Sequence, residues 1–413
     1  KFFIKSLKLK MKNTLRLLLI FTLFNIYTFA QSQPYVILIS FDGFRWDYPS
    51  RGLSPNLDLM KHEGVSAISF KPCFPSKTFP NHLSIITGLY PAHHGIIENH
   101  FEDQFSKEVY KISDTISVRD PKWYRGEAFW ETAKRQGIIT ASYFWPGSEL
   151  TADYRRPNYY KNYEHTKAYS DRVNGVIEWL KLPYGERPHF ITMYFDAADS
   201  YGHKFGPDSP QVDSAIQVLD SQLGDLFVKL KEINLFDSSD IIVVSDHGMT
   251  EINSERIINI DELLDGINYK MDNSGVILSF DKDENDLNEI YAKLISSEEH
   301  FSVYLKKDIP AFYHFSDSYL IGDLVAIADL GWTFRDKKKK SNEKYFQGGN
   351  HGFDNNVLDM HGIFFAMGPS FKKNYRTGTI ENIDVYPLLC KIFNIVPAFN
   401  IDGRFEKIGF ILK

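Results

Sequence analysis

The chain has 413 residues, 43% of them hydrophobic, with 53 acidic and 47 basic side chains and a formal net charge of −6 at pH 7. Six basic and no acidic residues lie in positions 1–30, so the rest of the chain carries a net charge of −12. This acidity excludes a general binder of long nucleic acid, because that affinity comes mainly from phosphate neutralisation. A small nucleotide or other phosphodiester stays compatible as the partner. The sequence does not determine the oligomeric state.

Residues 1–30 are typical of an upstream extension and a signal peptide. Residues 1–10 precede Met11 and are left out of the fold. A basic start then leads into the apolar stretch 17–24, and the Thr-Phe-Ala sequence at 28–30 has the form of a signal-peptidase site. The alternative is a membrane anchor, but the apolar stretch is shorter than the roughly 20 residues of a spanning helix. We expect a periplasmic or secreted protein with no stable membrane span after cleavage.

Three unbroken apolar runs each lead to acidic residues. The runs are Val36–Phe41 before Asp42, Phe190–Phe195 before Asp199, and Ile241–Ser245 before Asp246 and His247. Such Val-, Ile- and Phe-rich runs are typical of parallel strands buried on both faces. Ligands of open α/β sheets bind at the carboxyl ends of the strands. We therefore expect these distant side chains to meet at one edge of a sheet.

Thr78 is a candidate nucleophile. Pro80 and the apolar residues up to Gly88 predict a helix that begins near Thr78, with an early proline and a terminal glycine. Free amides at the start of that helix favour an anion, so they are expected to hold a phosphoryl group near the hydroxyl. The alternative role of a lone threonine before a proline is a helix N-cap.

Six further side chains form a chemically consistent set of metal ligands. They are three aspartates and three histidines: Asp42, Asp199, His203, Asp246, His247 and His351. Imidazole nitrogen suits Zn²⁺ better than Mg²⁺ or Ca²⁺, so the set predicts two zinc ions. A single aspartate after a strand is more often a turn residue or a helix cap. The occurrence of all these groups in one chain favours the metal-site interpretation.

These motifs resemble those of the nucleotide pyrophosphatase/phosphodiesterase family, in the alkaline phosphatase superfamily, and the likeness suggests a bacterial secreted member. The resemblance implies one zinc on Asp42, Thr78, Asp246 and His247, and a second on Asp199, His203 and His351. It also implies that Asn99 binds a phosphoryl oxygen. Phe79 and Tyr163 resemble the aromatic pair that sandwiches the nucleobase, although an aromatic residue in a loop is more often a packing residue.

The rest of the chain predicts a doubly wound α/β fold with a mostly parallel central sheet, and the resemblance implies that this fold is alkaline-phosphatase-like. Helical patterns at Ala128–Gln136 and Val212–Leu235 alternate with the strands. We expect one catalytic domain over residues 31–413, with a small α+β insertion at about 252–347. The expected insertion contains the strands Gly275–Phe280 and Phe301–Leu305, the helix Asn285–Ile295, and the lysine run Lys337–Lys340, which we interpret as a solvated loop. Cys73 and Cys390 allow one bridge or two free thiols.

The resulting hypothesis is a secreted two-zinc phosphodiesterase. It hydrolyses nucleotide phosphodiester or pyrophosphate bonds to nucleoside 5′-monophosphates through a phosphothreonine at Thr78, with configuration at phosphorus retained. The alternative on the same scaffold is a phosphomonoesterase or a lysophospholipid or phosphocholine phosphodiesterase. A non-catalytic binding protein of this fold is disfavoured, because none of the seven expected site residues is lost.

Overall fold

The computed structural model describes residues 33–413, except 270, 274–275, 281–286 and 336–346. The described residues from 35 to 413 belong to one compact unit. The predicted signal peptide and the lysine run Lys337–Lys340 lie outside the described residues. Among the residues that are described, no helix has both the length and the apolar character needed to cross a membrane. The account below concerns the unit at residues 35–413.

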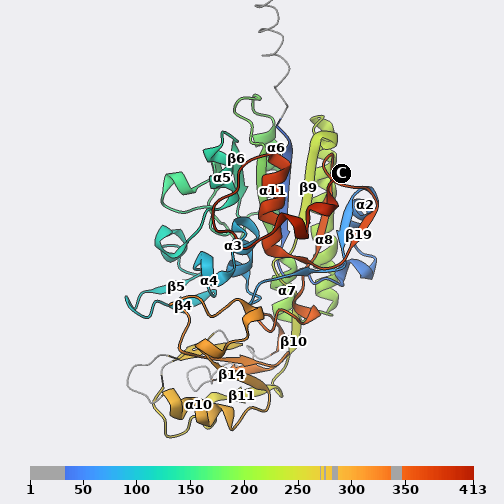
Figure 1. The fold of residues 1–413 in the computed structure, drawn as a ribbon. Coiled ribbons are helices and arrows are strands. Elements are labelled where there is room, and N and C mark those ends of the chain that lie inside the picture. The colour runs from blue at the N-terminus through green and yellow to red at the C-terminus, as the bar shows by residue number, and fades with distance from the viewer. Residues whose placement is uncertain (1–32, 270, 274–275, 281–286, 336–346) are drawn as a thin grey trace, which may run out of the picture. The chain divides into compact units, whose positions relative to one another are not determined.

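The core of this unit is an eight-stranded sheet with the order β19-β2-β18-β9-β1-β8-β6-β7 (Figure 1). The central strand β1 (Tyr35–Phe41) runs parallel to β8 (Phe190–Phe195) and to β9 (Ser239–Val244). The other strands are β2 (Val65–Ala67), β6 (Thr140–Tyr143), β7 (Tyr159–Lys161), β18 (Phe364–Met367) and β19 (Tyr375–Thr377). Strand β18 runs antiparallel to both of its neighbours. The observed sheet confirms the predicted mostly parallel α/β fold.

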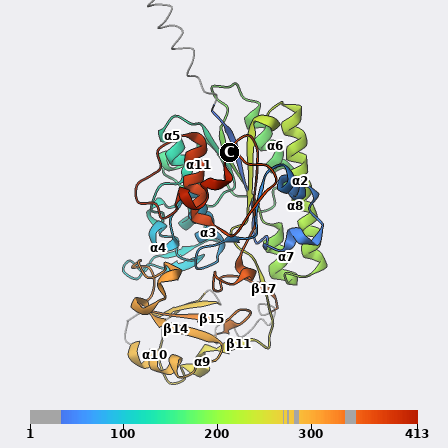
Figure 2. The ribbon, with the colours of Figure 1, turned by 45° about the vertical axis from the view of Figure 1, so that its right-hand side comes forward.

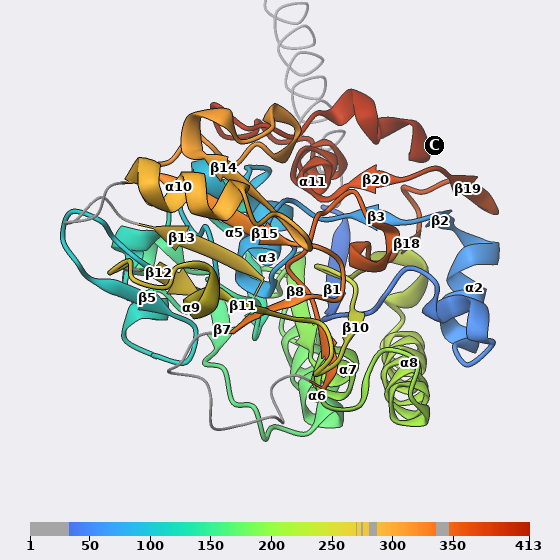
Figure 3. The same ribbon diagram turned by 90° about the horizontal axis from the view of Figure 1, so that it is seen from below.

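Helices cover both faces of the sheet, as Figure 3 shows from one end. One face is covered by α3 (Thr78–Thr87), α5 (Phe129–Arg135) and α11 (Val385–Phe393), and the other by α2 (Pro55–Glu63), α6 (Tyr169–Leu180) and α8 (Pro210–Glu232). Alternate residues of β1 point to opposite faces, so Val36 and Leu38 join one core while Ile37 and Ile39 join the other. An unbroken apolar strand is therefore buried on both sides.

The predicted helices agree closely with the observed ones. The pattern at Ala128–Gln136 corresponds to α5, and the pattern at Val212–Leu235 corresponds to α8, which begins two residues earlier. The earlier start has a local cause, because Ser209 caps the helix by accepting the amide of Val212 at 3.4 Å and Pro210 occupies the first turn.

Residues between β10 (Thr250–Ile252) and β17 (Gly348–Asn350) build a second, smaller sheet (Figure 2). Its antiparallel order is β12-β13-β15-β14, with β12 at Met271–Asn273, β13 at Ile277–Phe280, β15 at Leu324–Ala328 and β14 at Phe301–Leu305. Two helices, α9 (Ile260–Leu263) and α10 (Leu287–Ile295), and the parallel pair β11 (Ile257–Asn259) and β16 (Thr333–Arg335) accompany it. Strands β10 and β17 pair antiparallel in a two-stranded sheet of their own, so the two ends of this segment lie side by side.

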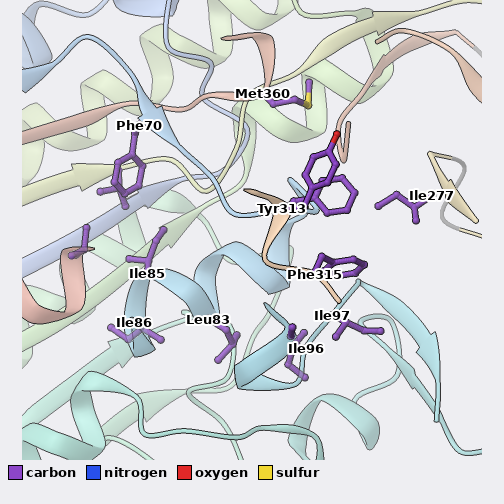
Figure 4. Close-up of a cluster of buried hydrophobic side chains, with 14 of the residues drawn as sticks. Phe70, Leu83, Ile85, Ile86, Ile96, Ile97, Ile277, Tyr313, Phe315 and Met360 are labelled. Atoms are coloured by element: carbon purple, nitrogen blue, oxygen red, sulfur yellow. The ribbon is translucent and has the colours of Figure 1, made fainter. Parts of the chain in front are cut away.

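The small sheet and the large one share a hydrophobic core. Figure 4 shows Ile277, Tyr313 and Phe315 from the small-sheet segment in the same cluster of buried side chains as Ile96 and Ile97. The ring centroids of Phe74 and Tyr313 are 4.4 Å apart, and those of Phe74 and Phe315 are 5.2 Å apart. Each fully buried aliphatic or aromatic side chain of this kind contributes about 1.5–3 kcal/mol. The segment is thus packed onto the body by core residues.

The remaining elements surround the carboxyl edge of the large sheet. They are the pair β3 (Phe70–Lys71) and β20 (Ile380–Glu381), the hairpin of β4 (His100–Glu102) and β5 (Val109–Lys111), and the helices α4 (Pro91–His94) and α7 (Ala197–Phe205). Cys73 and Cys390 are both buried free thiols, which decides between the two possibilities left open by the sequence.

Candidate active site

The predicted ligands meet at the carboxyl edge of the sheet. Asp42 directly follows β1, Asp246 and His247 follow β9, and His351 directly follows β17. Asp199 and His203 lie one turn apart on α7, the helix after β8, rather than at a strand end. Residues four apart on a helix share one face, so this spacing presents both side chains together.

Gly43 allows the end of β1 and the helix α7 to come close. Its φ of +66° is in the left-handed region, and a Cβ there would lie 2.8 Å from the Cα of Asp199. The Asp199 amide donates to the Asp42 carbonyl oxygen at 3.0 Å. A side chain at position 43 would therefore push α7 away from the end of β1.

One group of metal-binding atoms is fully enclosed by protein. It consists of Asp42, Asp246 and His247, whose side chains are all buried and whose ligand atoms lie within 4.8 Å of one another. His247 Nε2 is 3.3 Å from Asp42 Oδ1 and 3.1 Å from Asp246 Oδ2. The Thr78 hydroxyl lies 3.2 Å from the same Nε2 atom. The candidate nucleophile therefore borders this enclosed cluster.

The second group is more open. It consists of Asp199, His247 and His351, whose ligand atoms also lie within 4.8 Å of one another. His247 therefore belongs to both groups. His203 Nε2 lies 3.3 Å from Asp199 Oδ1 and 3.1 Å from His351 Nε2. The His247 and His351 rings stack with centroids 3.5 Å apart. The geometry therefore places His203 beside Asp199 and His351, and it brings the two predicted ligand sets into contact through His247.

The carboxylates have unmet bonding capacity. Among the described residues, three buried oxygens of this site have no hydrogen-bond partner: Asp42 Oδ1, Asp199 Oδ1 and Asp246 Oδ2. An unpaired buried carboxylate oxygen is costly, because it loses water without gaining a donor. Each of the three aspartates contributes one such oxygen to the same place, and this arrangement is suited to binding cations.

The histidines are held in one tautomer. His203 Nδ1 lies 2.9 Å from the Gly349 carbonyl, His247 Nδ1 lies 2.8 Å from the Gly248 carbonyl, and His351 Nδ1 lies 2.8 Å from the Ser76 carbonyl. A carbonyl only accepts, so each Nδ1 carries the proton and donates it. In the neutral ring, each Nε2 then carries an unprotonated lone pair. Metal-ligating histidines use this arrangement to fix the ring.

The pKa shifts of the site residues also favour a site that binds cations. Burial, together with the neighbouring Asp246 and Asp199 carboxylates, raises the pKa of Asp42 well above its usual range, and burial likewise raises the pKa of Asp246. Burial opposes the charge of Asp199 too, but the adjacent His203 lowers the pKa of that carboxyl. Burial lowers the pKa of His247 to about 3. Burial opposes the charge of His203, but the adjacent Asp199 carboxylate raises the pKa of that imidazole. Carboxylates that repel one another, beside a His247 imidazole that stays neutral, suit a centre whose positive charge is supplied by metal.

Thr78 is the first residue of α3 and does not act as its cap. The N-cap is Lys77, and the Thr78 hydroxyl lies beside His247 instead. The expectation of several free amides at this helix start is wrong. Phe79 donates its amide to Asn99 Oδ1 at 3.0 Å, and Pro80 has no amide hydrogen, so only the Thr78 amide is left. The Asn99 amide group then still has its Nδ2 donors for a phosphoryl oxygen.

The two predicted base-binding aromatics both follow Thr78 in the chain and belong to different segments. Phe79 is half-buried, with its ring centroid 6.4 Å from that of Tyr110. Tyr163 is 43% exposed and packs edge-on against Phe144 and Tyr194 at 5.4 and 6.1 Å. Phe79 and Tyr163, both within the described chain, form no ring contact with one another.

Two supporting residues escaped the sequence analysis. Tyr194, inside β8, donates its hydroxyl to Asp42 Oδ2 at 2.5 Å. Lys77 is buried and donates from Nζ to the His351 carbonyl at 2.7 Å, and Gly352 leaves room for it, because a Cβ there would lie 2.2 Å from Lys77 Cε. Tyr194 is indistinguishable from core residues in its apolar run. Lys77 carried a usable signal, since it adjoins Thr78.

A doubly wound sheet with such a ligand set around a hydroxyl at its carboxyl edge is the architecture of a hydrolase with an alkaline-phosphatase-like fold. Residues 36–354 match the family described as type I phosphodiesterase / nucleotide pyrophosphatase. The chain belongs to this family. Because its relatives and its fold are those of nucleotide pyrophosphatases/phosphodiesterases, it is an enzyme of this type.

Similar proteins agree over most of the chain. The rat ectonucleotide pyrophosphatase/phosphodiesterase family member 3 is 36% identical over 394 residues, which cover 92% of this chain and 44% of that protein. The human family member 5 is 33% identical over 388 residues, which cover 94% of this chain and 80% of that protein. The chain thus spans less than half of the rat relative and most of the human one.

Solved structures give the same result. The murine ectonucleotide pyrophosphatase/phosphodiesterase 5 matches with a TM-score of 0.86 at 32% sequence identity, covering 92% of this chain and all of that one. An inactive threonine-to-alanine variant of the murine protein, in complex with AMP, matches with the same TM-score.

Proposed function

We propose that this protein hydrolyses nucleotide phosphodiester or pyrophosphate bonds and releases nucleoside 5′-monophosphates, with Thr78 as nucleophile. One observation carries the proposal. Three partnerless carboxylate oxygens and the Nε2 atoms of three histidines converge beside the Thr78 hydroxyl, which lies 3.2 Å from His247 Nε2. A hydroxyl next to such a cluster is suited to attack at phosphorus.

Two zinc ions suit the ligands by donor type, since imidazole nitrogen and carboxylate oxygen are both common in zinc sites. Asp42, Asp246, His247 and Thr78 would hold one ion. Asp199, His203 and His351 would hold the other. When bound, the ions lower the pKa of a hydroxyl or water and offset charge on the phosphoryl group.

The chain's own residues then divide the reaction into two displacements. The Thr78 hydroxyl loses its proton and forms a bond to phosphorus as the bond to the leaving oxygen breaks, which gives a phosphothreonine ester. A water molecule next cleaves this ester, restores the hydroxyl and releases the monophosphate. Each step inverts phosphorus, so the overall configuration is retained. Asn99 orients the phosphoryl group through its free Nδ2 donors.

Phe79 and Tyr163 are proposed to bind the nucleobase. Stacking on an aromatic ring tolerates any base, because every base has a π face. Two relatives support a nucleotide substrate: the murine protein described in complex with AMP, and a Xenopus laevis protein named bis(5′-adenosyl)-triphosphatase, 36% identical over 366 residues. The inactivity of the murine threonine-to-alanine variant supports a threonine nucleophile in this fold.

Residues 31–413 are proposed to act as one catalytic domain, with residues 252–347 inserted between the ligands His247 and His351. Residues 11–30 are proposed to direct export and to be removed near Gln31. N-terminal sequencing of exported protein tests the second proposal. A Met11 start in membrane-bound material would indicate a tethered enzyme instead.

A three-substrate assay tests the function. Purified protein is compared on nitrophenyl thymidine monophosphate, nitrophenyl phosphate and nitrophenyl phosphocholine, each with and without zinc. The proposal requires the nucleotide diester to have the highest kcat/KM. A preference for the monoester would indicate a phosphatase, and a preference for the choline ester would indicate a lipid-headgroup phosphodiesterase.

A further inference from the structure

The hairpin of β4 and β5 connects the small-sheet segment to the substrate side of the candidate site. Asn99 directly precedes β4, and its carbonyl accepts the amide of Ile112 at 3.1 Å, which closes the base of the hairpin. Asn99 Oδ1 accepts the amide of Phe79. On the inner face, Phe101 and Tyr110 stack at 5.0 Å. The position of the hairpin therefore sets the position of Asn99.

The tip of this hairpin is held by one residue of the small-sheet segment. Tyr319 donates its hydroxyl to Asp103 Oδ2 at 2.9 Å, and its ring lies 5.5 Å from that of Phe105. The guanidinium of Arg125 lies 5.0 Å from the centroid of the same ring. Tyr319 thus contacts three residues of the body at once.

Asp103 makes the tip rigid. Its Oδ1 accepts the amides of Phe105 at 2.8 Å and Ser106 at 3.0 Å, and its backbone amide donates to the Glu108 carbonyl at 2.8 Å. Burial opposes the charge of this carboxylate, yet these amides and the Tyr319 hydroxyl lower the pKa of Asp103. The carboxylate therefore holds the turn with one oxygen and Tyr319 with the other.

The base of the hairpin is supported from the same segment. Ile96 and Ile97, which lead into Asn99, are buried in one hydrophobic core with Tyr313 and Phe315 (Figure 4). Contacts at the tip and at the base both come from one loop region, between β14 and β15. Hydrophobic packing therefore holds the base of the hairpin, and the Tyr319–Asp103 hydrogen bond holds its tip.

We propose that the small-sheet segment positions Asn99 for phosphoryl binding, and that the Tyr319–Asp103 hydrogen bond holds the hairpin in place for this purpose. The inference rests on the proposed function, because it assigns the segment a role in the same site. Tyr319 is a positioning residue, since it acts through the hairpin and does not contact the substrate site in the described contacts.

The substitution Tyr319→Phe removes the donor and keeps the ring. Tyr319 is 40% exposed, so loss of its hydrogen bond should lower kcat/KM about threefold to tenfold. The loss should be equal, within about twofold, on nitrophenyl thymidine monophosphate and on the base-free nitrophenyl phenylphosphonate, because Asn99 contacts the phosphoryl group common to both. A base-binding residue would affect only the nucleotide.

The matched control is Tyr291→Phe, on α10 of the same segment. Tyr291 is half-buried, and the described residues supply no hydrogen-bond partner for its hydroxyl. This variant should keep wild-type kcat/KM. Asp103→Asn preserves the turn acceptor Oδ1 and can donate from Nδ2 to the Tyr319 hydroxyl, so it should lose less activity than Tyr319→Phe.

A double-mutant cycle decides whether the effect passes through Asn99. In an Asn99→Ala background, Tyr319→Phe should cost less than about twofold, because the group it positions is already gone. Additive losses would overturn the proposal, as would a Tyr319→Phe enzyme indistinguishable from Tyr291→Phe. If wild-type protein turns over neither ester, the proposed function fails instead, so the two failures are distinct.

Discussion

The two halves of the ligand cluster differ in their access to solvent. Asp42, Asp246 and His247 are at most 1% exposed, whereas the side chains of Asp199 and His203 are 19% and 41% exposed. The enclosed half borders Thr78 and is crowded with like charges. The open half pairs Asp199 with the imidazole of His203. In the proposed reaction, the enclosed half would hold the attacking group, and the open half would admit water.

Breaking the enclosed half at Thr78 should have the largest effect. Thr78→Ala should lower kcat on nitrophenyl thymidine monophosphate more than about a hundredfold, because a covalent route has no alternative nucleophile. Thr78→Ser keeps a hydroxyl and should retain part of the activity. An unchanged melting temperature serves as the control for folding. A Thr78→Ala enzyme with more than about a hundredth of the wild-type rate would favour direct attack by water.

The two halves can be separated by their histidines. His203→Ala should lower the metal content from two ions to about one per chain, because His203 lies only beside the open group. His247→Ala should reduce the content further, since His247 contributes to both groups. Elemental analysis of dialysed protein measures this. Equal losses in the two variants would contradict the division into an enclosed half and an open half.

Tyr163 tests whether the outer rim recognises a base. Stacking on one aromatic ring is worth roughly 1–3 kcal/mol, so Tyr163→Ala should lower kcat/KM on the nucleotide diester about tenfold to a hundredfold. The base-free phenylphosphonate should hardly change. If the base is bound equally in ground and transition states, the loss appears mainly in KM. Equal losses on both substrates would argue for a non-nucleotide substrate.

Tyr194 should give the smallest effect and a local one. Tyr194→Phe removes the hydroxyl that donates to Asp42, and losing such a supporting donor typically costs about tenfold in metal affinity. The loss should concern one ion, that of the enclosed half, in a competition assay with a chromophoric chelator. Tyr143→Phe, also in a strand of the large sheet, is the control. Weakened binding of both ions would show a general disturbance of the sheet.

The sequence predicted the elements that one local pattern defines. The apolar runs that lead to Asp42 and Asp246 became parallel strands, and the pattern at Ala128–Gln136 became a helix, because burial on two faces or on one stripe leaves a direct signal. The antiparallel strand β18 was not predicted. Strand direction depends on the path of the chain between strands, which local periodicity does not contain.

The candidate site shows the same limit. Side-chain chemistry was enough to select the aspartates and histidines, and the structure brings all six together. Sequence could not show that the Phe79 amide is already bonded to Asn99, nor that Tyr194 reaches Asp42. Both contacts join residues from different elements. Their partners become neighbours only after the sheet has formed.

The metal content of active wild-type protein tests the central claim most directly. Protein purified without added chelator is analysed for zinc and assayed in parallel on nitrophenyl thymidine monophosphate. The account predicts two zinc ions per chain, loss of activity on chelation and recovery when zinc is restored, because two connected groups of carboxylate and imidazole ligands surround Thr78. Full activity in protein that holds one ion or none would contradict it.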